Sequence, residues 1–509
     1  MKVNSKILVL AAITAFGLGS CGGTPSNSEN QSEKAEKTEV VWWVPCGSDL
    51  ETNTIYKYVC GIADSYNSSH DDVHVSIVSK GNKNNDYTGT ANAVSDALTA
   101  GNTPSMVTTY GTYVAAWRKA APKAVVDVTD YGKTLEADSD FNQSYLVAEK
   151  QQYDGKSYYS LPYSKSGEAF QYNKEVFSAV GAVAAGSAVE KGYPAPVSLD
   201  SKQAYSVPTT FVEMMDLARQ MKVDYPSVNW GRGEDGQYVA VPVIYESSMN
   251  LFVTVLESAG ITFMDATKPL AQSVPFIDDP AAKAAIVQLK KWSNEGLLAT
   301  KNQLGKDGSY TKYPSTVVSE GNAFVMITST ANAPWCAADG YSIGFDRVPK
   351  WDDNSEYRTL SQGPSIAFFN HNNQDEIDGA LDFYKYLTST ANTAKLALDT
   401  AYFPCRQSSY EDEGLKATLE NAAKTINYAT DYDVKKSAYI GEVLNLNKKV
   451  SEGNEYFMSP VNELSASVRT AVSGIMDAIF NDVEATTDEA IQSLVNSAFA
   501  DAKATIFRD

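Results

Sequence analysis

The sequence predicts an α/β protein with two lobes, in which helices cover parallel sheets. The first observation is that strand-like and helix-like segments alternate, which is the order that a parallel sheet with helices on both faces requires. The second is length. About 470 residues follow the polar N-terminal stretch, and that is too many for one small core.

The alternation begins with residues 40–44, a run of β-branched and aromatic residues that predicts a first strand. Apolar residues at helical spacing between Ile55 and Tyr66 predict a helix behind it. The series then continues as strand, helix, strand and helix at residues 73–78, 87–98, 106–109 and 113–120.

The same two kinds of segment recur after a break. Thr210 is expected to cap a helix that begins at Phe211, and Gly296 is expected to close a helix that has Pro280 near its start. Residues 179–208, rich in Ala, Gly, Ser and Pro, are expected to form a surface insertion. Strands are predicted at 169–172, 324–327 and 365–369, and helices at 211–221, 250–259, 281–295, 377–387, 468–479 and 490–502.

The N-terminus has the pattern of an export signal. Lys2 and Lys6 precede an apolar run from 7 to 18, which is shorter than the ~20 residues that a membrane span needs. The run ends in Leu-Gly-Ser-Cys, which resembles the lipobox of bacterial lipoproteins. We therefore expect a signal peptide at 1–20 and lipid on Cys21; the alternative is an ordinary signal peptide with a chance cysteine.

Residues 21–39 are almost devoid of apolar side chains and predict a flexible tether between lipid and folded body. Stable anchoring takes about two acyl chains, which a diacylglyceryl group would supply. The expected location is therefore the cell membrane, on its extracytoplasmic face.

The chain is acidic, with a formal net charge of −20 that becomes −22 once Lys2 and Lys6 leave with the signal peptide. No basic stretch with interleaved aromatic residues occurs in the sequence, so nucleic-acid binding is not expected. The three histidines are not at zinc-site spacing and no CxxC pair occurs, so neither a structural metal nor another cofactor is expected.

Four cysteines remain besides Cys21: Cys46, Cys60, Cys336 and Cys405. Export permits disulfides, and four cysteines allow three full pairings between which the sequence does not choose. Cys46 with Cys60 is the most local option. The alternative is that all four are small buried apolar residues.

Several segments, in their shared order, resemble the extracellular solute-binding proteins of ABC importers, in the branch that serves sugars and glycerol-3-phosphate. The resemblance covers nearly all of the chain after the tether. The segments are VVWWVP at 40–45, ALTAGNTPSMVTTYG at 97–111, YYSLPYSKSGEAFQYNKEVFSAVG at 158–181, PTTFVEMMDLARQMK at 208–222, SEGNAFVMITST at 319–330, YSIGFDRVPK at 341–350, LSQGPSIAFF at 360–369, TAYFPCRQSSY at 400–410 and SPVNELSASVRT at 459–470.

This resemblance implies the two-lobed fold of periplasmic binding proteins, type II, with a ligand cleft between lobes joined by crossing strands. Crossings are expected near 161–170, 311–319 and 360–368. Lobe one is expected to comprise 40–163 plus 316–363, and lobe two 164–315 plus 364–509. Clefts between lobes and the carboxyl ends of parallel strands also favour ligand binding on physical grounds.

Aromatic residues at strand ends could form the walls of a sugar pocket, because a sugar offers weakly apolar ring faces as well as hydroxyls. Trp43 is a candidate because side chains alternate along a strand, so that one of Trp42 and Trp43 can face the cleft while the other faces the core. The alternative places both in the core. Tyr110 follows the third strand, whereas Trp117 is expected in the core.

The resemblance to glycerol-3-phosphate-binding proteins implies further ligand contacts. It matches Arg469 to an arginine that grips phosphate, with Arg406 as a competing anion site and a solvated helix residue as the alternative for Arg469. At Gly363 it implies close approach of the ligand to the backbone. The remaining implied contacts are Tyr87, Ser166 (or Ser164), Ser329 or Thr330, and Tyr402.

One position departs from that branch. The glycerophosphate type carries an acidic residue after the tyrosine matched by Tyr110, and Gly111 stands there in this chain. A missing acceptor weakens discrimination for a ligand hydroxyl. Glu246 could supply a compensating carboxylate, although such residues are more often simply exposed.

Three classes of function are compatible with these features. The favoured one is a monomeric importer component that captures a small solute, a sugar or polyol phosphate, and delivers it to a membrane permease. A lipid-anchored glycosidase would need a pair of carboxylates across a cleft, and no sequence context marks such a pair. No G-x-S-x-G, H-E-x-x-H or P-loop motif occurs. An adhesin is the third alternative.

Overall fold

The computed structural model describes residues 37–82, 85–177, 205–307, 310–337, 342–422 and 432–508. The predicted signal peptide, Cys21 and most of the predicted tether and surface insertion lie outside these residues. The tether was predicted to run to residue 39, but the first strand begins at Thr38 and pairs along its whole length. Residues 38 and 39 therefore belong to the folded body.

The first sheet has five strands in the order β2-β1-β3-β15-β4. β1 runs parallel to β2 and β3, while β15 lies antiparallel to β3 and β4. Side chains alternate along β1, so that Val40, Trp42 and Val44 enter one core and Trp43 enters another. The strands are β1 (Thr38–Val44), β2 (Val73–Ser79), β3 (Met106–Thr109), β4 (Leu161–Pro162) and β15 (Ser365–Phe368).

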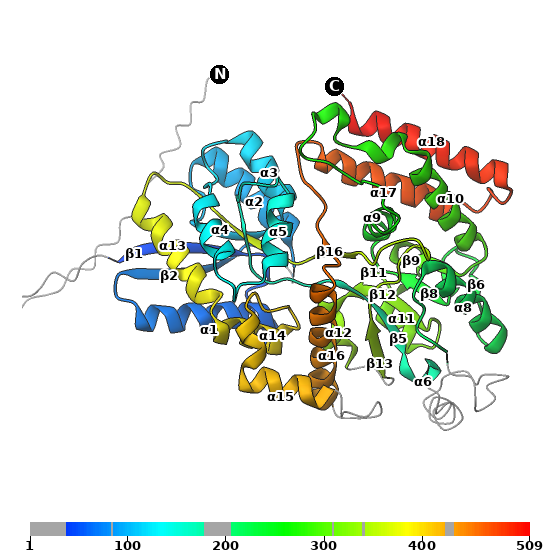
Figure 1. Cartoon of the computed structure of the whole chain (residues 1–509), viewed down its shortest axis with the longest axis horizontal. Coiled ribbons are helices and arrows are strands. Elements are labelled where there is room, and N and C mark those ends of the chain that lie inside the picture. Colours follow the sequence, from blue (N-terminus) through cyan, green and yellow to red (C-terminus); the bar gives the residue numbers. More distant parts are fainter. Residues whose placement is uncertain are drawn as a thin grey trace, which may run out of the picture. The chain divides into compact units, whose positions relative to one another are not determined.

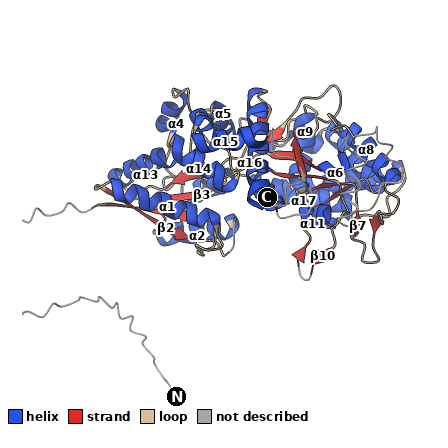
Figure 2. Cartoon of the chain, turned by 90° about the horizontal axis from the view of Figure 1, so that it is seen from below, coloured by secondary structure: helices blue, strands red, loops and turns tan. Residues whose placement is uncertain are grey.

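Helices cover both faces of this sheet. α1 and α13 contribute to the core that contains Trp42, and α2 and α3 to the core that contains Trp43. Figure 2 shows α13 and α2 on opposite sides of the strands. The helices around this sheet are α1 (Thr54–Ser69), α2 (Tyr87–Ala100), α3 (Gly111–Ala120), α4 (Thr129–Glu136), α5 (Gln143–Gln151), α13 (Gln374–Leu387) and α14 (Thr390–Thr400).

The second sheet also has five strands, in the order β13-β5-β12-β8-β9. β12, β8 and β9 are mutually parallel neighbours, while β5 lies antiparallel to both β12 and β13. The strands are β5 (Glu168–Asn173), β8 (Val243–Tyr245), β9 (Leu298–Thr300), β12 (Val325–Ser329) and β13 (Ile343–Asp346).

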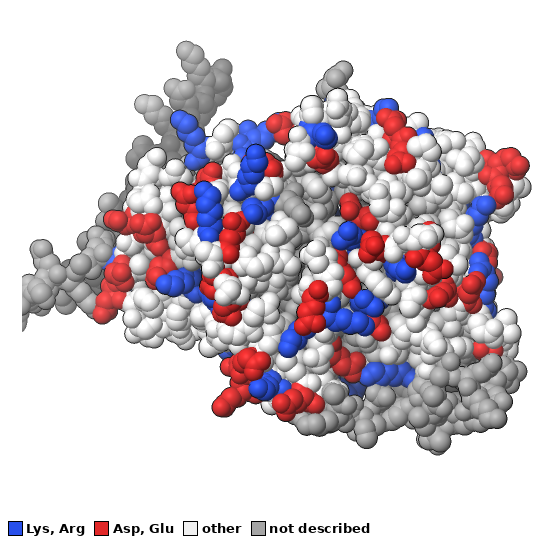
Figure 3. Space-filling model, in the orientation of Figure 1, with Lys and Arg blue, Asp and Glu red and all other residues white. Residues whose placement is uncertain are grey.

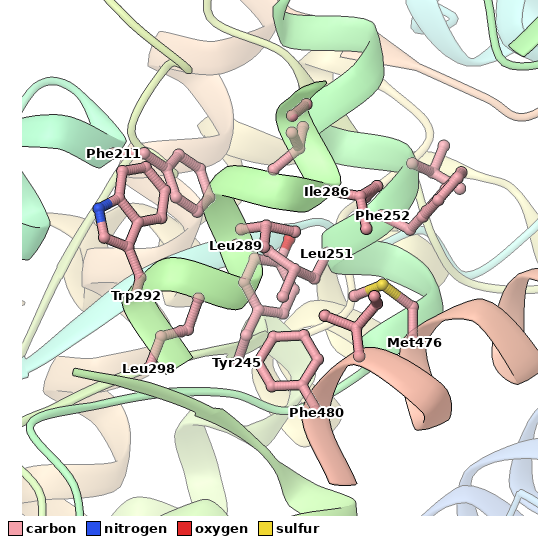
Figure 4. Close-up of a cluster of buried hydrophobic side chains, with 14 of the residues drawn as sticks. Phe211, Tyr245, Leu251, Phe252, Ile286, Leu289, Trp292, Leu298, Met476 and Phe480 are labelled. Carbon is pink, nitrogen blue, oxygen red and sulfur yellow. The ribbon is translucent and has the colours of Figure 1, made fainter. Parts of the chain in front are cut away.

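The second sheet is also covered on both faces. Figure 4 shows one of its two cores, where Tyr245 and Leu298 pack against helices α9, α10 and α17. Thr210 caps α8 as predicted, since its hydroxyl accepts a hydrogen bond from the Glu213 N–H at 3.1 Å. The helices are α6 (Lys174–Phe177), α8 (Phe211–Asp224), α9 (Ser248–Ser258), α10 (Pro280–Asn294), α11 (Pro314–Ser319), α12 (Ala333–Cys336), α15 (Glu413–Ala422), α16 (Tyr432–Glu452), α17 (Ser465–Asn481) and α18 (Asp488–Ile506).

Short strands complete the described chain. They pair as β6 with β7, β10 with β11, and β14 with β16. Their bounds are β6 (Gly231–Arg232), β7 (Tyr238–Ala240), β10 (Lys306–Asp307), β11 (Tyr310–Thr311), β14 (Thr359–Leu360) and β16 (Tyr456–Phe457).

Two of the three expected crossings join the two sheets. The chain leaves β4 for β5 across residues 163–167, and it returns from β13 to β15 across residues 347–364 (Figure 1). The expected crossing at 311–319 is not one, because α11 packs against β12 of the second sheet. Ser166 and Gln362 join the two crossings by a pair of backbone hydrogen bonds of 3.0 and 2.7 Å.

The strands are distributed between the sheets differently from the expected lobes. β12 and β13 fall in the segment 316–363 that was expected in lobe one, but both belong to the second sheet. β15 falls in the segment expected in lobe two, but it pairs with β3. The chain therefore crosses back later than expected, just before β15.

The four cysteines in the described chain form no disulfide. Cys46 and Cys405 are buried, and burial raises the pKa of each thiol to about 12. Cys336 lies with its sulfur 4.0 Å from Gln171 Oε1. Within the same described residues, no helix has the length and apolar character that a membrane span needs.

Candidate functional site

A cleft of about 1000 Å³ lies where strands of both sheets end. The parallel strands β3, β8, β9 and β12 all end next to residues of its wall, which is where open α/β sheets bind ligands. The wall comprises Asn85–Thr88, Tyr110–Tyr113, Gln152, Glu168, Glu246, Ser247, Met249, Asn250, Phe263, Met264, Lys301, Ser329, Leu360–Gln362, Met458–Val461, Ser465, Ala466, Val468 and Arg469.

Four of the predicted ligand residues line this cleft: Tyr87, Tyr110, Ser329 and Arg469. They come from the start of α2, the turn after β3, the end of β12 and the first half of α17. The fold thus brings together residues that are up to 382 positions apart in the sequence (469 − 87).

Tyr87 and Tyr110 form an aromatic corner in the cleft. Their ring centroids are 4.6 Å apart with the rings inclined at 63°, which is an edge-to-face arrangement. Asp86 places Tyr87 as the first residue of α2 by accepting a 3.0 Å hydrogen bond from the Gly89 N–H. Desolvation raises the pKa of both phenols, so the hydroxyls are neutral donors and acceptors at physiological pH.

Tyr402 and Ser164 lie behind this corner and do not line the cleft. Both face a cavity of about 20 Å³ whose wall also includes Tyr87. Burial raises the pKa of Tyr87 most, and the nearby phenol of Tyr402 raises it further. Tyr402, for which the resemblance implied a direct ligand contact, therefore lies beside Tyr87 and is not part of the cleft wall.

Trp43 was predicted to contact ligand, but its side chain lies outside the cleft. It is packed with Val94 and Val107 on the face of the first sheet opposite Trp42, and Lys80 Nζ lies 4.0 Å from its ring centroid. Strand alternation therefore separates the two tryptophans as expected, but both faces of β1 are covered by helices. Neither side is left for a ligand.

Three other predicted contacts hold the crossings together instead of lining the cleft. Ser166 pairs through its backbone with Gln362, and the Thr330 hydroxyl accepts a 3.2 Å hydrogen bond from the Gly167 N–H. Gly363 has φ +89°, and a Cβ there would overlap the carbonyl oxygen of Ser164. The neighbouring crossing by itself therefore requires a glycine at this position.

Arg469 is the arginine available for an anion. It is exposed at the cleft, and the described residues offer it no ion-pair partner. Arg406, the competing candidate, is already bound to Asp138 at 2.8 Å, Asp140 at 3.2 Å and the Thr388 carbonyl oxygen at 2.6 Å. These bonds occupy its guanidinium within the first lobe's helices and loops.

Besides Asp86, which caps α2, two acidic residues line the cleft. Glu246 accepts hydrogen bonds from the Thr328 hydroxyl and from Lys301 Nζ at 3.5 Å, so it lies in the wall and is not simply exposed. Glu168 had no signal in the sequence. It is buried at the start of β5 and accepts from the Tyr245 hydroxyl at 2.5 Å and from Asn250 Nδ2 at 2.9 Å.

Burial dominates the titration of Glu168. Desolvation raises the pKa of its carboxyl to about 7, and the hydrogen bonds from Tyr245 and Asn250 oppose this shift without cancelling it. Near neutral pH the group is therefore partly protonated, and it can both donate and accept hydrogen bonds.

Charged side chains of both signs are interspersed over the visible outer surface of the protein (Figure 3).

Gln152 was not predicted as a site residue, because no sequence motif marks it. It follows α5 directly, and its side chain occupies the space beside Gly111, where a Cβ would overlap Gln152 Oε1. The position that lacks an acidic side chain is thus filled by an amide from elsewhere in the chain. Apolar wall area comes from Met249, Phe263 and Met458.

The chain belongs to the bacterial extracellular solute-binding protein family, whose model matches residues 61–423. It is therefore a binding protein by class. This match gives no support to the hypotheses of a surface glycosidase or an adhesin.

Two relatives carry the same name, sn-glycerol-3-phosphate-binding periplasmic protein UgpB. The one from Agrobacterium fabrum is 23% identical over 74% of this chain and 76% of its own length. The one from Brucella abortus is 21% identical over 75% of this chain and 78% of its own length.

Solved structures confirm the two-lobed fold of type II binding proteins. The cyclic α-maltosyl-1,6-maltose binding protein from Arthrobacter globiformis has a TM-score of 0.61 at 17% identity, covering 92% of this chain and 100% of that one. UgpB from Mycobacterium tuberculosis in complex with glycerophosphocholine has a TM-score of 0.61 at 14% identity, with coverage of 93% and 98%. MalE from Bdellovibrio bacteriovorus bound to maltotriose has a TM-score of 0.58 at 13% identity, with coverage of 91% and 99%.

Proposed function

We propose that this protein is the substrate-binding component of an ABC importer and captures a carbohydrate or a glycerol-3-phosphate-like solute. The observation that carries the proposal is the cleft of about 1000 Å³ at the ends of β3, β8, β9 and β12. Its volume is at the upper end of the range for pockets that enclose small molecules. One sequence relative and two proteins of the same fold bind such solutes, as their names state.

The wall has the composition that a polyhydroxylated ligand needs. Tyr87, Tyr110 and Phe263 offer aromatic surface for sugar ring faces, while Glu168 and Ser329 offer hydrogen-bonding groups for hydroxyls. We propose that Tyr87, Tyr110, Ser329 and Arg469 contact the ligand directly. Tyr402 and Ser164 would hold Tyr87 in place from behind.

The two crossings, 163–167 and 347–364, would act as the hinge. Ligand contacts come from elements around both sheets, so the bound state would favour a closed arrangement by differential affinity. The lobe boundaries that we propose follow the sheets, with 38–162 and 365–400 around the first sheet and 168–346 and 413–508 mainly around the second. A closed form would present one surface to the permease, and the protein would act as a monomer because one chain supplies the whole cleft.

We further propose that the protein is exported and anchored by lipid on Cys21. The charged start, the apolar run at 7–18 and the Leu-Gly-Ser-Cys ending support this. Residues 22–36 would form the tether and keep the binding protein at high effective concentration beside its permease. Replacement Cys21→Ala in the producing bacterium should move the protein from the membrane pellet to the soluble fraction. An unchanged membrane fraction would reject the anchor.

The ligand class is tested by thermal denaturation of the tag-free chain from residue 37 onward with maltotriose, sn-glycerol 3-phosphate and glycerophosphocholine. A true ligand at 100 times its Kd stabilises the fold by about 2.7 kcal/mol, which is a readily measured rise in Tm. The proposal expects such a rise with at least one class. No rise with any carbohydrate or glycerophosphate compound would reject it.

A further inference from the structure

Three polar atoms in the wall of the cleft are buried without a hydrogen-bond partner: Gln152 Nε2, Ser361 Oγ and Gln362 Nε2. Gln152 and Ser361 are the most deeply buried of these residues, at 3% and 4% exposed. Most buried polar atoms in folded proteins are hydrogen-bonded, because leaving one unsatisfied is costly. Gln152 and Ser361 both line the cleft, so a rotation of either side chain would bring its unsatisfied group to a ligand there.

Gln152 is held firmly from the backbone while its amide stays unbonded. Its N–H donates to the Ala148 carbonyl oxygen at 3.3 Å, and its carbonyl oxygen accepts from the Val461 N–H at 2.6 Å. The side chain lies against Gly111, next to Tyr110, and any other residue at 111 would displace it. The amide is therefore placed in the wall beside the aromatic corner.

Ser361 is also held by a backbone hydrogen bond, at the opposite end of the wall segment that Gln152 contacts. Its N–H donates to the Phe457 carbonyl oxygen at 2.8 Å. Residues 458–461, which follow Phe457 and end at the partner of Gln152, all line the cleft. Gln152 and Ser361 thus flank one continuous stretch of wall.

A second buried glutamine, Gln303, provides a comparison, because its side-chain amide is fully hydrogen-bonded within the protein. Gln303 is 1% exposed and is not part of the cleft wall. Its Oε1 accepts from the Thr300 N–H at 2.8 Å and from the Thr300 hydroxyl at 2.7 Å, and its Nε2 donates to Asn481 Oδ1 at 3.2 Å. Gln303 completes its bonds within the protein, whereas the Gln152 amide does not.

We propose that the Gln152 amide and the Ser361 hydroxyl donate hydrogen bonds to uncharged oxygen atoms of the ligand, and that Gln152 is a specificity-determining residue beside Gly111. The inference rests on the proposed binding function. An amide and a hydroxyl suit the hydroxyl oxygens of a polyol and the hydroxyl and ring oxygens of a sugar. Being uncharged, they act independently of Arg469, which would serve a phosphate. Rotation of the amide by half a turn costs little and lets Nε2 face the cleft.

The first test needs no ligand and compares Gln152→Met with Gln303→Met, two substitutions of similar shape at buried glutamines. The Tm of Gln152→Met should equal or exceed that of the parent protein, because an unsatisfied buried amide is removed. The Tm of Gln303→Met should fall, because Thr300 and Asn481 lose their partner. A fall for Gln152→Met as large as that for Gln303→Met would overturn the inference.

The second test measures the affinity for whichever of maltotriose, sn-glycerol 3-phosphate and glycerophosphocholine raises the Tm of the parent protein. Gln152→Met and Gln152→Glu should each weaken binding by about tenfold, and Ser361→Ala by somewhat less, while Gln303→Met leaves affinity unchanged. Unchanged affinity in Gln152→Met and Gln152→Glu would overturn the inference and leave the proposed function standing. No binding by the parent protein would instead reject the proposed ligands, and the ligand-free comparison would still decide on Gln152.

Discussion

Two groups of buried polar side chains differ in how completely they are bonded. Beneath the crossings, Lys165 and Glu149 are both fully buried and form an ion pair of 3.3 Å. Ser365 donates to Glu149 at 2.7 Å and accepts from Lys165 at 2.8 Å, and Ser160 donates to Glu149 at 2.5 Å. In the cleft wall, Gln152 and Ser361 are nearly as buried but keep unsatisfied atoms.

This difference separates polar groups that hold the fold from those that are available to a ligand. Lys165 lies on the first crossing and Ser365 at the end of the second, so the closed network ties the two crossings together. Breaking such a network leaves an uncompensated buried charge, whereas removing an unsatisfied wall group does not. Substitutions in the two groups should therefore differ in their effect on stability.

Lys165→Met should lower the free energy of unfolding by about 3–5 kcal/mol, because it leaves the Glu149 carboxylate buried without its cation. Urea denaturation of the purified protein measures this directly. Lys395, whose exposed ion pair with Asp399 spans 2.7 Å, is the control, and Lys395→Met should cost at most about 0.5 kcal/mol. Equal small losses in the two variants would contradict the role assigned to the network.

Glu168 should make the protein less stable as the pH rises from about 4.5 to about 7. Its pKa is raised to about 7 in the folded state against an ordinary value of 4.5, so the folded protein binds the extra proton within this window. The stability linked to this proton is complete below pH 4.5 and lost above pH 7, a change of about 3 kcal/mol. Glu168→Gln should remove that part of the pH dependence in urea titrations at several pH values. An identical pH profile for parent and variant would disprove the assignment.

Arg469→Ala should weaken the binding of sn-glycerol 3-phosphate by about 2 kcal/mol, roughly 30-fold, because a charge-assisted hydrogen bond to phosphate is lost. Maltotriose, which carries no charge, should be affected far less. Titration calorimetry with both compounds measures the difference. Arg508→Ala is the control, because Arg508 is not a residue of the cleft wall. Equal effects on the two ligands would rule out a phosphate-binding role.

Tyr402→Phe should have the smallest effect, about 1 kcal/mol on ligand affinity, since it removes only a hydroxyl in the small cavity that Tyr402 shares with Tyr87. Tyr87→Phe in the same assay should cost at least as much, because Tyr87 itself lines the cleft. If Tyr402→Phe were the more damaging of the two, Tyr402 would have to contact the ligand itself.

Much of the fold could be predicted from local patterns. The strand at 106–109 and the helices at 87–98 and 281–295 were found within two residues of their bounds, because periodicity and capping are local signals. The allocation of strands to sheets could not be predicted, since β12, β13 and β15 pair with partners more than 150 residues away. Pairing over such distances leaves no trace in the local sequence.

The site was predictable only in part, for a similar reason. Tyr87, Tyr110 and Arg469 could be placed because resemblance or strand-end position marked them, and all three line the cleft. At Gly363 the resemblance implied close approach of a ligand, and the group that lies close to it in the described chain is the Ser164 carbonyl. Gln152 could not be found, because its role depends on the space beside Gly111, 41 residues earlier (152 − 111).

We propose that the ligand binds in the cleft against Tyr87, Tyr110 and Gln152. A crystal structure with the compound that raises the Tm most is the direct test of this binding site. We expect ligand density between the aromatic corner and the wall at residues 458–461, with ligand oxygens within hydrogen-bond distance of Gln152 and Ser361. Ligand density at any other place on the protein, with this cleft filled only by water, would contradict it.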